Sequence, residues 1–287
     1  MGVFRFKRFE VVNERSAMKV NTDGVLLGAA MTIREGDRYL LDIGTGTGTI
    51  ALMAAQRVSG KDCHVADAPR NDVNGDSQTC SCADIDNGQA RNEVNGDGKR
   101  APGENSEAIH VDAIDIDEPS ASEAASNFQN SPWSEYLHAH NMSLDDFAQS
   151  LPQDRSYDLI FSNPPYFEDS LTAPDERKST ARHTSDGLSY RDIFEFAKVR
   201  LTDNGRVSLV LPADQEAALC RYARMCGLHL FRILRVRTVP RKAPTRIIAE
   251  FSRERCKAVA DEVLTIQNQG QYTQEYLSLT HEFYLFA

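Results

Sequence analysis

Three glycines at alternate positions constrain the fold of this chain more than any other feature. Gly44, Gly46 and Gly48 follow the apolar run at residues 39–43 and precede an alanine-rich segment at residues 49–57. The apolar run predicts a buried strand, and the alanine-rich segment predicts a helix. The glycines therefore lie at a strand-to-helix turn, where the backbone can come close to a ligand and the free N–H groups of the helix can face it.

Strands and helices alternate along most of the chain. Apolar runs predict further strands at 109–116, 136–140, 157–162, 206–211, 229–239 and 246–251. Helices are predicted at 120–130, 190–201 and 215–226. This alternation is typical of the α/β class with a doubly wound, mostly parallel sheet, here of seven strands. Because no helix separates the last two strands, we expect them to form a C-terminal antiparallel hairpin. Residues 1–287 are expected to form a single domain.

Several residues are predicted to cap these helices. Thr22 or Asp23 is expected as the N-cap of a short helix that follows a turn. Ser120 is expected as the N-cap of the helix at 120–130, with Glu123 completing a capping box. Gly227 stands where the helix at 215–226 needs a C-terminal cap.

Residues 61–107 break the alternation. This segment is dense in Asn, Asp, Gly and Ser, nearly lacks large apolar residues, and holds ten acids against five bases. Such a composition buries too little apolar surface to offset the loss of conformational entropy on ordering. We therefore expect a disordered acidic insertion within the domain.

The six cysteines are expected to be free thiols rather than a disulfide framework. Cys63, His64, Cys80 and Cys82 could in principle hold zinc, but their spacing matches no standard structural site. No metal is expected.

The composition is that of an ordinary globular protein, with 41% hydrophobic and 26% charged residues. No apolar run approaches the roughly 20 residues that a bilayer span needs. The first nine residues alternate charged and aromatic side chains and lack the apolar region of a signal peptide. We expect a soluble, cytoplasmic monomer that does not bind membranes.

The net charge of −10 argues at first against a nucleic-acid partner, but the charges are unevenly distributed. Residues 221–249 hold eight bases and no acid. A local basic face can bind nucleic acid even on an acidic protein, and Arg237, Arg241 and Lys242 are the candidates for that contact. The alternative is a solvated helix and hairpin.

Carboxylates accompany the glycine loop. Asp42 stands directly in front of it, and Asp115 and Asp117 end the strand predicted at 109–116. An acid at the end of the second strand can bind ribose hydroxyls, and Asp115 is the preferred candidate for a nucleoside cofactor. The alternatives are a tight turn without a ligand and a solvated strand end.

The tetrapeptide Asn163-Pro164-Pro165-Tyr166 follows the strand predicted at 157–162. The amide oxygen of Asn163 and a backbone carbonyl beside a proline, that of Pro164, can both accept hydrogen bonds from a planar amine. They would thereby aim the nitrogen lone pair at a methyl donor. Tyr166 offers a ring on which a flipped base can stack. The alternative is a proline-rich turn. With the glycine loop, the tetrapeptide predicts transfer of a methyl group from S-adenosylmethionine to a nitrogen.

These motifs resemble those of class I S-adenosylmethionine-dependent amino methyltransferases, which have a Rossmann-like fold. More narrowly, the chain resembles the bacterial tRNA1(Val) (adenine(37)-N6)-methyltransferases over nearly its whole length, apart from residues of about 61–107. The narrower resemblance rests on residues 4–9 (FRFKRF), 18–28 (MKVNTDGVLLG), 130–133 (NSPW), 181–183 (ARH) and 277–285 (LSLTHEFYL).

The resemblance implies N6-methylation of an adenine in tRNA, with S-adenosylmethionine as cofactor. It implies that the segment containing Lys19, Thr22 and Asp23 closes over the cofactor. It also implies that the cofactor's adenine lies near residues 141–143, where many relatives carry an acid. This chain has Asn141 and Ser143 there, and we expect either to take the place of that acid. Three further residues are expected to contact the RNA: Pro165, Arg182 and His183. The alternative for His183 is a surface histidine without a role in binding.

Other functions fit these motifs less well. A protein glutamine N5-methyltransferase acting on release factors uses the same tetrapeptide, because a glutamine amide is also planar. Against it, no helical domain precedes the glycine loop in this chain. DNA adenine methylation would need a target-recognition domain, which is not visible. A nucleic-acid-binding protein with a relic cofactor fold would not need both loops, and the glycine spacing disfavours a dehydrogenase.

Overall fold

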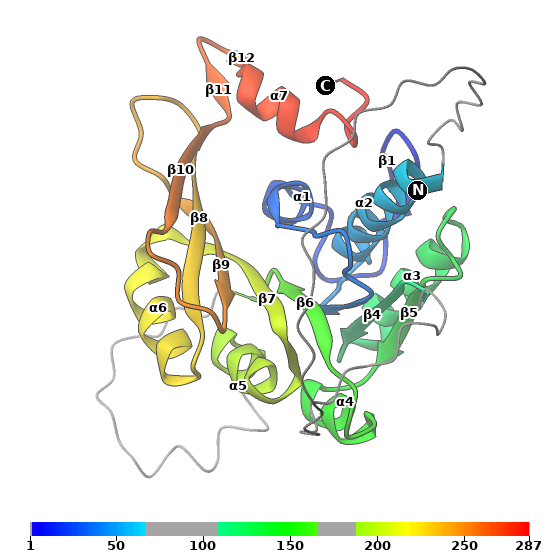
Figure 1. Cartoon of the computed structure of the whole chain (residues 1–287). Helices are drawn as coiled ribbons and strands as arrows, with labels where there is room; N and C mark the ends of the chain where they lie inside the picture. The colour runs from blue at the N-terminus through cyan, green and yellow to red at the C-terminus, as the bar shows by residue number, and fades with distance from the viewer. Residues whose placement is uncertain (1, 67–107, 166–187, 287) are drawn as a thin grey trace, which may run out of the picture.

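An eight-stranded sheet forms the centre of the computed structural model, which describes residues 2–66, 108–165 and 188–286 (Figure 1). The strand order is β10-β8-β9-β7-β6-β3-β4-β5. The strands are β3 (Tyr39–Ile43), β4 (His110–Asp115), β5 (Leu137–Asn141), β6 (Tyr157–Ser162), β7 (Leu201–Pro212), β8 (His229–Arg237), β9 (Arg246–Ser252) and β10 (Ala260–Thr265). Strands β3 to β7 pair in parallel, while β9 runs antiparallel to both β7 and β8. The predicted α/β fold and the antiparallel β8–β9 hairpin are confirmed.

The eighth strand, β10, was not predicted. It pairs in parallel with β8 at the edge of the sheet, and of its residues only Leu264 is buried. An edge strand of this kind carries no alternating apolar pattern, because neither of its faces packs fully on the core. The sheet therefore contains the seven predicted strands and one polar edge strand.

Helices cover both faces of the sheet. One apolar cluster joins Leu40 of β3 to α1 (Thr22–Ala30), α2 (Thr49–Ala66) and α3 (Glu118–Gln129). The other joins the adjacent Leu41 to α4 (Leu144–Ser150), α5 (Tyr190–Arg200) and α6 (Glu216–Met225). Neighbouring side chains of one strand thus point to opposite faces of the sheet and pack into different cores, as expected for a doubly wound sheet.

The remaining elements lie outside the sheet. They are β1 (Val3–Arg5), β2 (Glu10–Val12), the 3-10 turn η2 (Ala213–Gln215), β11 (Gln267–Asn268), β12 (Gln271–Tyr272) and α7 (Gln274–Thr280). Helix α7 packs against α1 (Figure 1). Helix α2 extends to Ala66, so the first six residues of the predicted insertion are helical, and residues 67–107 lie outside the described residues. No helix among the described residues is long and apolar enough to cross a bilayer.

Two cap predictions are wrong and one is confirmed. Helix α1 is capped by Asn21, whose side chain accepts a hydrogen bond from the Gly24 N–H at 2.8 Å. Gly227, with φ of 76°, ends α6 and donates to the carbonyl of Arg224, as predicted. Neither Thr22 nor Asp23 is the N-cap of α1, because Asn21 already satisfies the first turn.

Helix α3 begins two residues earlier than predicted. Its N-cap is Asp117, whose carboxylate accepts hydrogen bonds from the N–H (3.0 Å) and the hydroxyl (2.6 Å) of Ser120. Pro119 fits the first turn because that turn needs no N–H there. Ser120 is therefore not the cap. Glu123 forms no capping box, because its carboxylate binds elsewhere.

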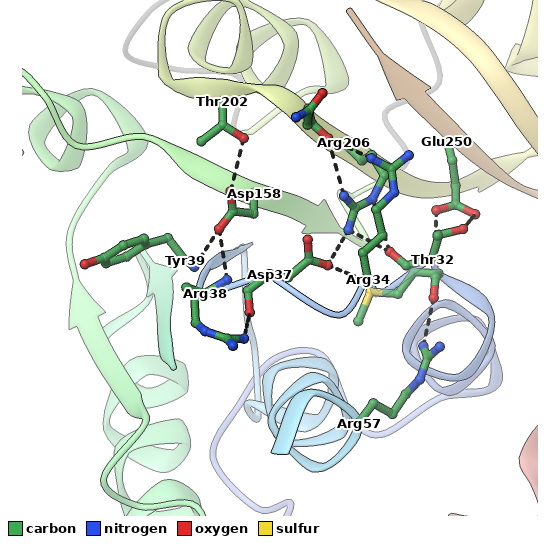
Figure 2. Close-up of polar contacts among 12 residues, drawn as sticks. Thr32, Arg34, Asp37, Arg38, Tyr39, Arg57, Asp158, Thr202, Arg206 and Glu250 are labelled. Atoms are coloured by element: carbon green, nitrogen blue, oxygen red, sulfur yellow. Dashed lines mark hydrogen bonds and ion pairs between the residues drawn. The ribbon is translucent and has the colours of Figure 1, made fainter. Parts of the chain in front are cut away.

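Buried charges connect the sheet to the loop that precedes β3. Arg206 of β7 is 1% exposed and bonds both the carboxylate of Asp37 and the carbonyl of Thr32. Glu250 of β9 is fully buried and accepts from the N–H and hydroxyl of Thr32 and from Arg232 (2.7 Å). Figure 2 shows Arg206, Asp37, Thr32 and Glu250 in one polar network. Each of these buried charges has a partner of opposite sign, as a low-dielectric interior requires.

Candidate active site

The glycine loop and the tetrapeptide meet at the carboxyl edge of the sheet. Strands β3 and β6 are adjacent and parallel, so the loops that follow them leave the same edge. The hydroxyl of Ser162 donates to the carbonyl of Ile43 at 2.6 Å, which joins the ends of the two strands. The N–H groups of Gly44 and Thr45 both donate to the carbonyl of Ile114 on β4. These bonds place the start of the glycine loop between Asn163 and Asp115.

Gly46 is favoured by its backbone conformation, and Gly48 by both its conformation and its neighbours. Gly46 and Gly48 have φ of 57° and 79°, a conformation that side chains disfavour. A Cβ on Gly48 would lie 2.4 Å from the ring of Phe128 on α3. A Cβ on Gly46 would meet Ser16 and Met18, at 3.5 and 3.6 Å, in the segment that precedes α1. The loop is therefore packed closely on α3 and on the N-terminal segment.

A cleft of about 320 Å³, counted to its open mouth, lies between the N-terminal segment and the glycine loop. Among the predicted site residues, Lys19, Gly44, Gly46 and Asn163 line it. The full lining consists of Met18, Lys19, Val20, Asn21, Gly24, Gly44, Thr45, Gly46, Thr47, Thr49, Ile50 and Asn163.

Asp42 lies beneath the glycine loop and is fully buried. One carboxylate oxygen accepts from the hydroxyl of Thr45 at 2.8 Å, and the other has no hydrogen-bond partner among the described residues. Burial raises the pKa of Asp42 to about 7, although the bond from Thr45 acts in the opposite direction. Asp42 does not line the cleft itself but lies under Thr45, which does.

Asp115 and Asp117 are separated by their partners. Asp115 ends β4, is half-buried, and accepts hydrogen bonds from the N–H groups of Gly46 (2.8 Å) and Asp117 (2.9 Å). Burial is the main cause of the raised pKa of Asp115. Asp117 instead caps α3. Asp115 is thus the carboxylate held beside the glycine loop, and each of its oxygens has a second lone pair to offer a hydroxyl group.

Asn163 is 5% exposed, and its amide nitrogen donates to the sulfur of Met18 at 3.6 Å. This contact turns the amide oxygen to the opposite side of the group, where it can accept from an amine. Pro164 is buried and Pro165 is exposed. Three predicted residues lie outside the described residues: Tyr166, Arg182 and His183.

The segment expected to close over the cofactor borders the cleft. The ammonium group of Lys19 donates to the carbonyl of Glu14 at 2.8 Å. Thr22 is exposed at the start of α1, and Asp23 forms an ion pair with Arg246 at 2.8 Å. The ion pair ties the first turn of α1 to the start of β9. Neither Thr22 nor Asp23 lines the cleft itself.

Asn141 and Ser143 both stabilise local backbone. The amide nitrogen of Asn141 donates to the carbonyls of Asp115 and Ile116, each at 3.1 Å. Ser143 is the N-cap of α4, where its hydroxyl accepts from the Asp146 N–H. These bonds place Asn141 beside the strand end that carries Asp115, and they bind Ser143 to the helix.

The predicted basic face is smaller than its eight bases suggested. Arg232, Arg235 and Arg246 are all engaged in ion pairs with acids that lie outside residues 221–249. The pairs are Arg232 with Glu250 and Glu262, Arg235 with Glu216 and Asp261, and Arg246 with Asp23. Because these acids lie outside the counted residues, the count of bases overstated the positive charge.

Arg237, Arg241 and Lys242 lie at the end of β8 and in the loop that joins it to β9. The guanidinium of Arg237 donates to the hydroxyl of Thr265, while Arg241 and Lys242 are exposed. Because β9 runs antiparallel to β7 and begins beside its carboxyl end, this loop shares the edge that carries Asn163.

Residues 16–18 are the part of the site that sequence reasoning missed. Met18 contacts Asn163 and lines the cleft, and Ser16 approaches Gly46, yet neither was assigned a role. The only available signal was that Met18 opens one of the segments on which the resemblance rested. Their importance comes from a contact between residues far apart in the chain.

Comparisons with known proteins place the chain among methyltransferases. The family model described as UPF0020, RMKL-like, methyltransferase domain matches residues 29–220. Relatives named tRNA1(Val) (adenine(37)-N6)-methyltransferase occur in Flavobacterium psychrophilum, at 33% identity over 99% of both chains, and in Bacteroides fragilis, at 35% identity over 98% of this chain and 97% of the relative.

A solved structure has the same fold at low identity. It is a predicted O-methyltransferase from Agrobacterium tumefaciens, with a TM-score of 0.55 and 13% identity, over 91% of this chain and 96% of that one. This likeness concerns the class I methyltransferase fold alone. The sequence relatives, which match over almost the whole length, are more specific. The chain belongs to the family of the tRNA1(Val) (adenine(37)-N6)-methyltransferases.

Proposed function

We propose that this protein transfers a methyl group from S-adenosylmethionine to N6 of an adenine in tRNA, at position 37 of tRNA1(Val). The observation that carries the proposal is the shared cleft: Asn163, the glycine loop and the segment before α1 surround one space. A methyl donor and a planar amine must meet in such a space. The named relatives, similar over nearly the full length, support the choice of substrate.

The cofactor supplies a methyl group on a positively charged sulfur and leaves as a neutral thioether. Gly44, Gly46 and Gly48 let the backbone approach it, and Asp115 accepts hydrogen bonds from its ribose hydroxyls. Asp42 contributes negative charge beneath the loop, which favours a cationic ligand. Residues of the surrounding segments complete the proposed site. Lys19, Thr22 and Asp23 cover it, and Asn141 or Ser143 lies near the adenine.

Asn163 and Pro164 position the substrate amine. The amide oxygen of Asn163 and the backbone carbonyl of Pro164 accept its two N–H groups, so that its lone pair faces the methyl group. The pKa of the nitrogen falls once it is alkylated, and its proton can leave to water, so the chain needs no dedicated base. Tyr166, next to Pro165 in the sequence, is assigned to stacking on the flipped base.

The RNA is assigned to the same edge of the sheet. Arg237, Arg241 and Lys242 provide positive charge there, where phosphates of the substrate can be bound. Pro165, Arg182 and His183 complete the assigned RNA contacts. Because one chain supplies all of these groups, we assign the activity to a monomer. Because the proposed substrate is tRNA, we assign the protein to the cytoplasm.

Three substrates offered in parallel test the proposal: bulk tRNA, a release factor and duplex DNA, each with methyl-labelled S-adenosylmethionine. The expected result is label in tRNA that co-migrates with N6-methyladenosine after digestion to nucleosides. Label in the release factor alone would support a glutamine methyltransferase instead. If the protein binds S-adenosylmethionine but labels none of the three substrates, the assigned substrate is wrong.

A further inference from the structure

Helix α3 turns a polar face toward the protein interior. Ser120, Glu123 and Asn127 are 3%, 1% and 2% exposed. Their spacing of three and four residues puts them on one side of the helix. We call these three residues the α3 clamp. Glu123 is a buried acid that the proposed reaction does not use, and a buried charge needs compensating partners.

The partners of Glu123 are backbone groups of the irregular segment between β2 and α1. Its carboxylate accepts hydrogen bonds from the N–H groups of Glu14 (2.6 Å), Arg15 (2.6 Å) and Ser16 (2.9 Å). Burial alone would raise the pKa of Glu123, but these three bonds outweigh it and lower the pKa. Three charge-assisted bonds to consecutive N–H groups fix the path of this part of the chain.

The other two clamp residues extend the attachment on either side. Asn127 accepts from the N–H of Val12 at 2.8 Å and donates to the carbonyls of Val12 (3.0 Å) and Thr47 (2.9 Å). Thr47 belongs to the glycine loop, so one side chain joins that loop to the N-terminal segment. The hydroxyl oxygen of Ser120, whose proton is donated to Asp117, lies 3.0 Å from the hydroxyl oxygen of Ser16.

The clamped segment leads directly into the wall of the cleft. The hydroxyl of Ser16 donates to the carbonyl of Met18 at 3.1 Å. The sulfur of Met18 accepts from the amide nitrogen of Asn163, and Lys19 lines the cleft next to it. A short path therefore runs from Glu123, through Ser16, to a residue assigned to catalysis.

We propose that Glu123 is a positioning residue that holds residues 14–19 against the glycine loop and thereby forms the fixed wall of the cofactor cleft. The inference rests on the proposed function, because it names a residue that acts on the same cleft. Cofactor affinity then depends on Glu123 although the side chain touches neither the cofactor nor the substrate. A wall that is ordered before binding removes an entropic cost that the cofactor would otherwise have to offset.

The test compares Glu123→Gln with Glu118→Gln, which removes an exposed carboxylate from the same helix. Calorimetry of the full chain with S-adenosylmethionine should show a Kd about tenfold higher for Glu123→Gln, because the wall must then be ordered during binding. Glu118→Gln should bind as the wild type does. At saturating cofactor, the KM for tRNA should not change in either variant.

A second readout does not depend on the cofactor. Arg15 and Lys19 are trypsin sites within the held segment, and their cleavage can be followed by mass spectrometry. Brief trypsin treatment should cut Glu123→Gln at these sites faster than wild type or Glu118→Gln. If the wild type fails to bind the cofactor, the proposed function fails, while the cleavage rates still test the anchoring.

Unchanged affinity or unchanged cleavage in a folded Glu123→Gln variant would overturn the inference. Should that variant not fold, Ser16→Ala breaks the same path one step closer to the cleft and leaves α3 and the backbone bonds to Glu123 intact. It removes the hydroxyl that contacts Ser120 and donates to the carbonyl of Met18. It should raise the Kd and the cleavage rate in the same direction, and wild-type values for both would overturn the proposed path from Glu123 to the cleft.

Discussion

Replacing Asp42 with asparagine tests whether ionisation of this buried carboxyl group destabilises the folded protein. Asp42 is fully buried, and burial raises its pKa from 3.8 to about 7. At 1.36 kcal/mol per pKa unit, that rise corresponds to about 4 kcal/mol of stability lost when the folded protein holds the ionised form. Because the pKa is higher in the folded state, the cost is absent below about pH 4, grows as the pH rises, and is complete above about pH 7.

Asp42→Asn removes this cost, since asparagine is neutral at every pH. The new amide N–H group occupies the position of the oxygen that has no partner among the described residues. A buried N–H group without an acceptor lowers the stability by about 1–3 kcal/mol. The variant should therefore be more stable than wild type by about 1–3 kcal/mol at pH 8. The gain should disappear at pH 5, where only about 1.7 kcal/mol of the electrostatic cost is present and the new N–H group offsets it.

Urea unfolding at pH 8 and pH 5 measures both values. Asp145→Asn, which removes an exposed carboxylate from α4, is the control and should change stability by less than about 0.5 kcal/mol at either pH. Asp42→Asn should also bind S-adenosylmethionine more weakly at pH 8, because the negative charge beneath the loop is lost. An equal change in stability at both pH values would refute the reasoning, because it would mean that Asp42 ionises in the folded protein without a cost.

Three further predictions concern catalysis, RNA binding and the buried network. Asn163→Ala should lower kcat roughly 100-fold or more while the Kd for S-adenosylmethionine stays within about threefold, and loss of cofactor binding would contradict its assigned role. Changing Arg237, Arg241 and Lys242 to Gln should raise the KM for tRNA and flatten its salt dependence by up to about 0.9 per lost phosphate contact. An unchanged salt slope would place the RNA elsewhere. Arg206→Met should destabilise the protein by about 3–5 kcal/mol in urea unfolding, because it leaves a buried carboxylate without its partner, and a loss below about 1 kcal/mol would argue against that cost.

The parts of the fold that the sequence predicted are those with a strong local signal. Strand β6 carries an apolar run and ends before two prolines, and its bounds match the prediction. The glycine loop was placed because glycines between a strand and a helix have a specific structural meaning. Strand β10 and the start of α3 were missed, because the first is polar and exposed and the second begins at an Asp-Glu-Pro sequence that resembles a loop.

The parts of the site that sequence could not predict depend on contacts between distant residues. Glu123 stands three residues after Ser120, which favoured a capping box, yet it binds a segment more than 100 residues away. Three of the bases in residues 221–249 form ion pairs with five acids outside that segment, and a count of local charges cannot reveal those pairs. The resemblance supplied what spacing could not: it directed attention to the segment around Met18 and Lys19, which the structure places at the cleft.

The most direct measurement of the central claim is methyl transfer to a single unmodified transcript. Wild-type protein would be given labelled S-adenosylmethionine and the tRNA1(Val) transcript with adenine, or with guanine, at position 37. We predict N6-methyladenosine in the first transcript, none in the second, and none in either with Asn163→Ala. Equal labelling of both transcripts would contradict the assigned position, and no labelling of either by a protein that binds the cofactor would contradict the assigned substrate.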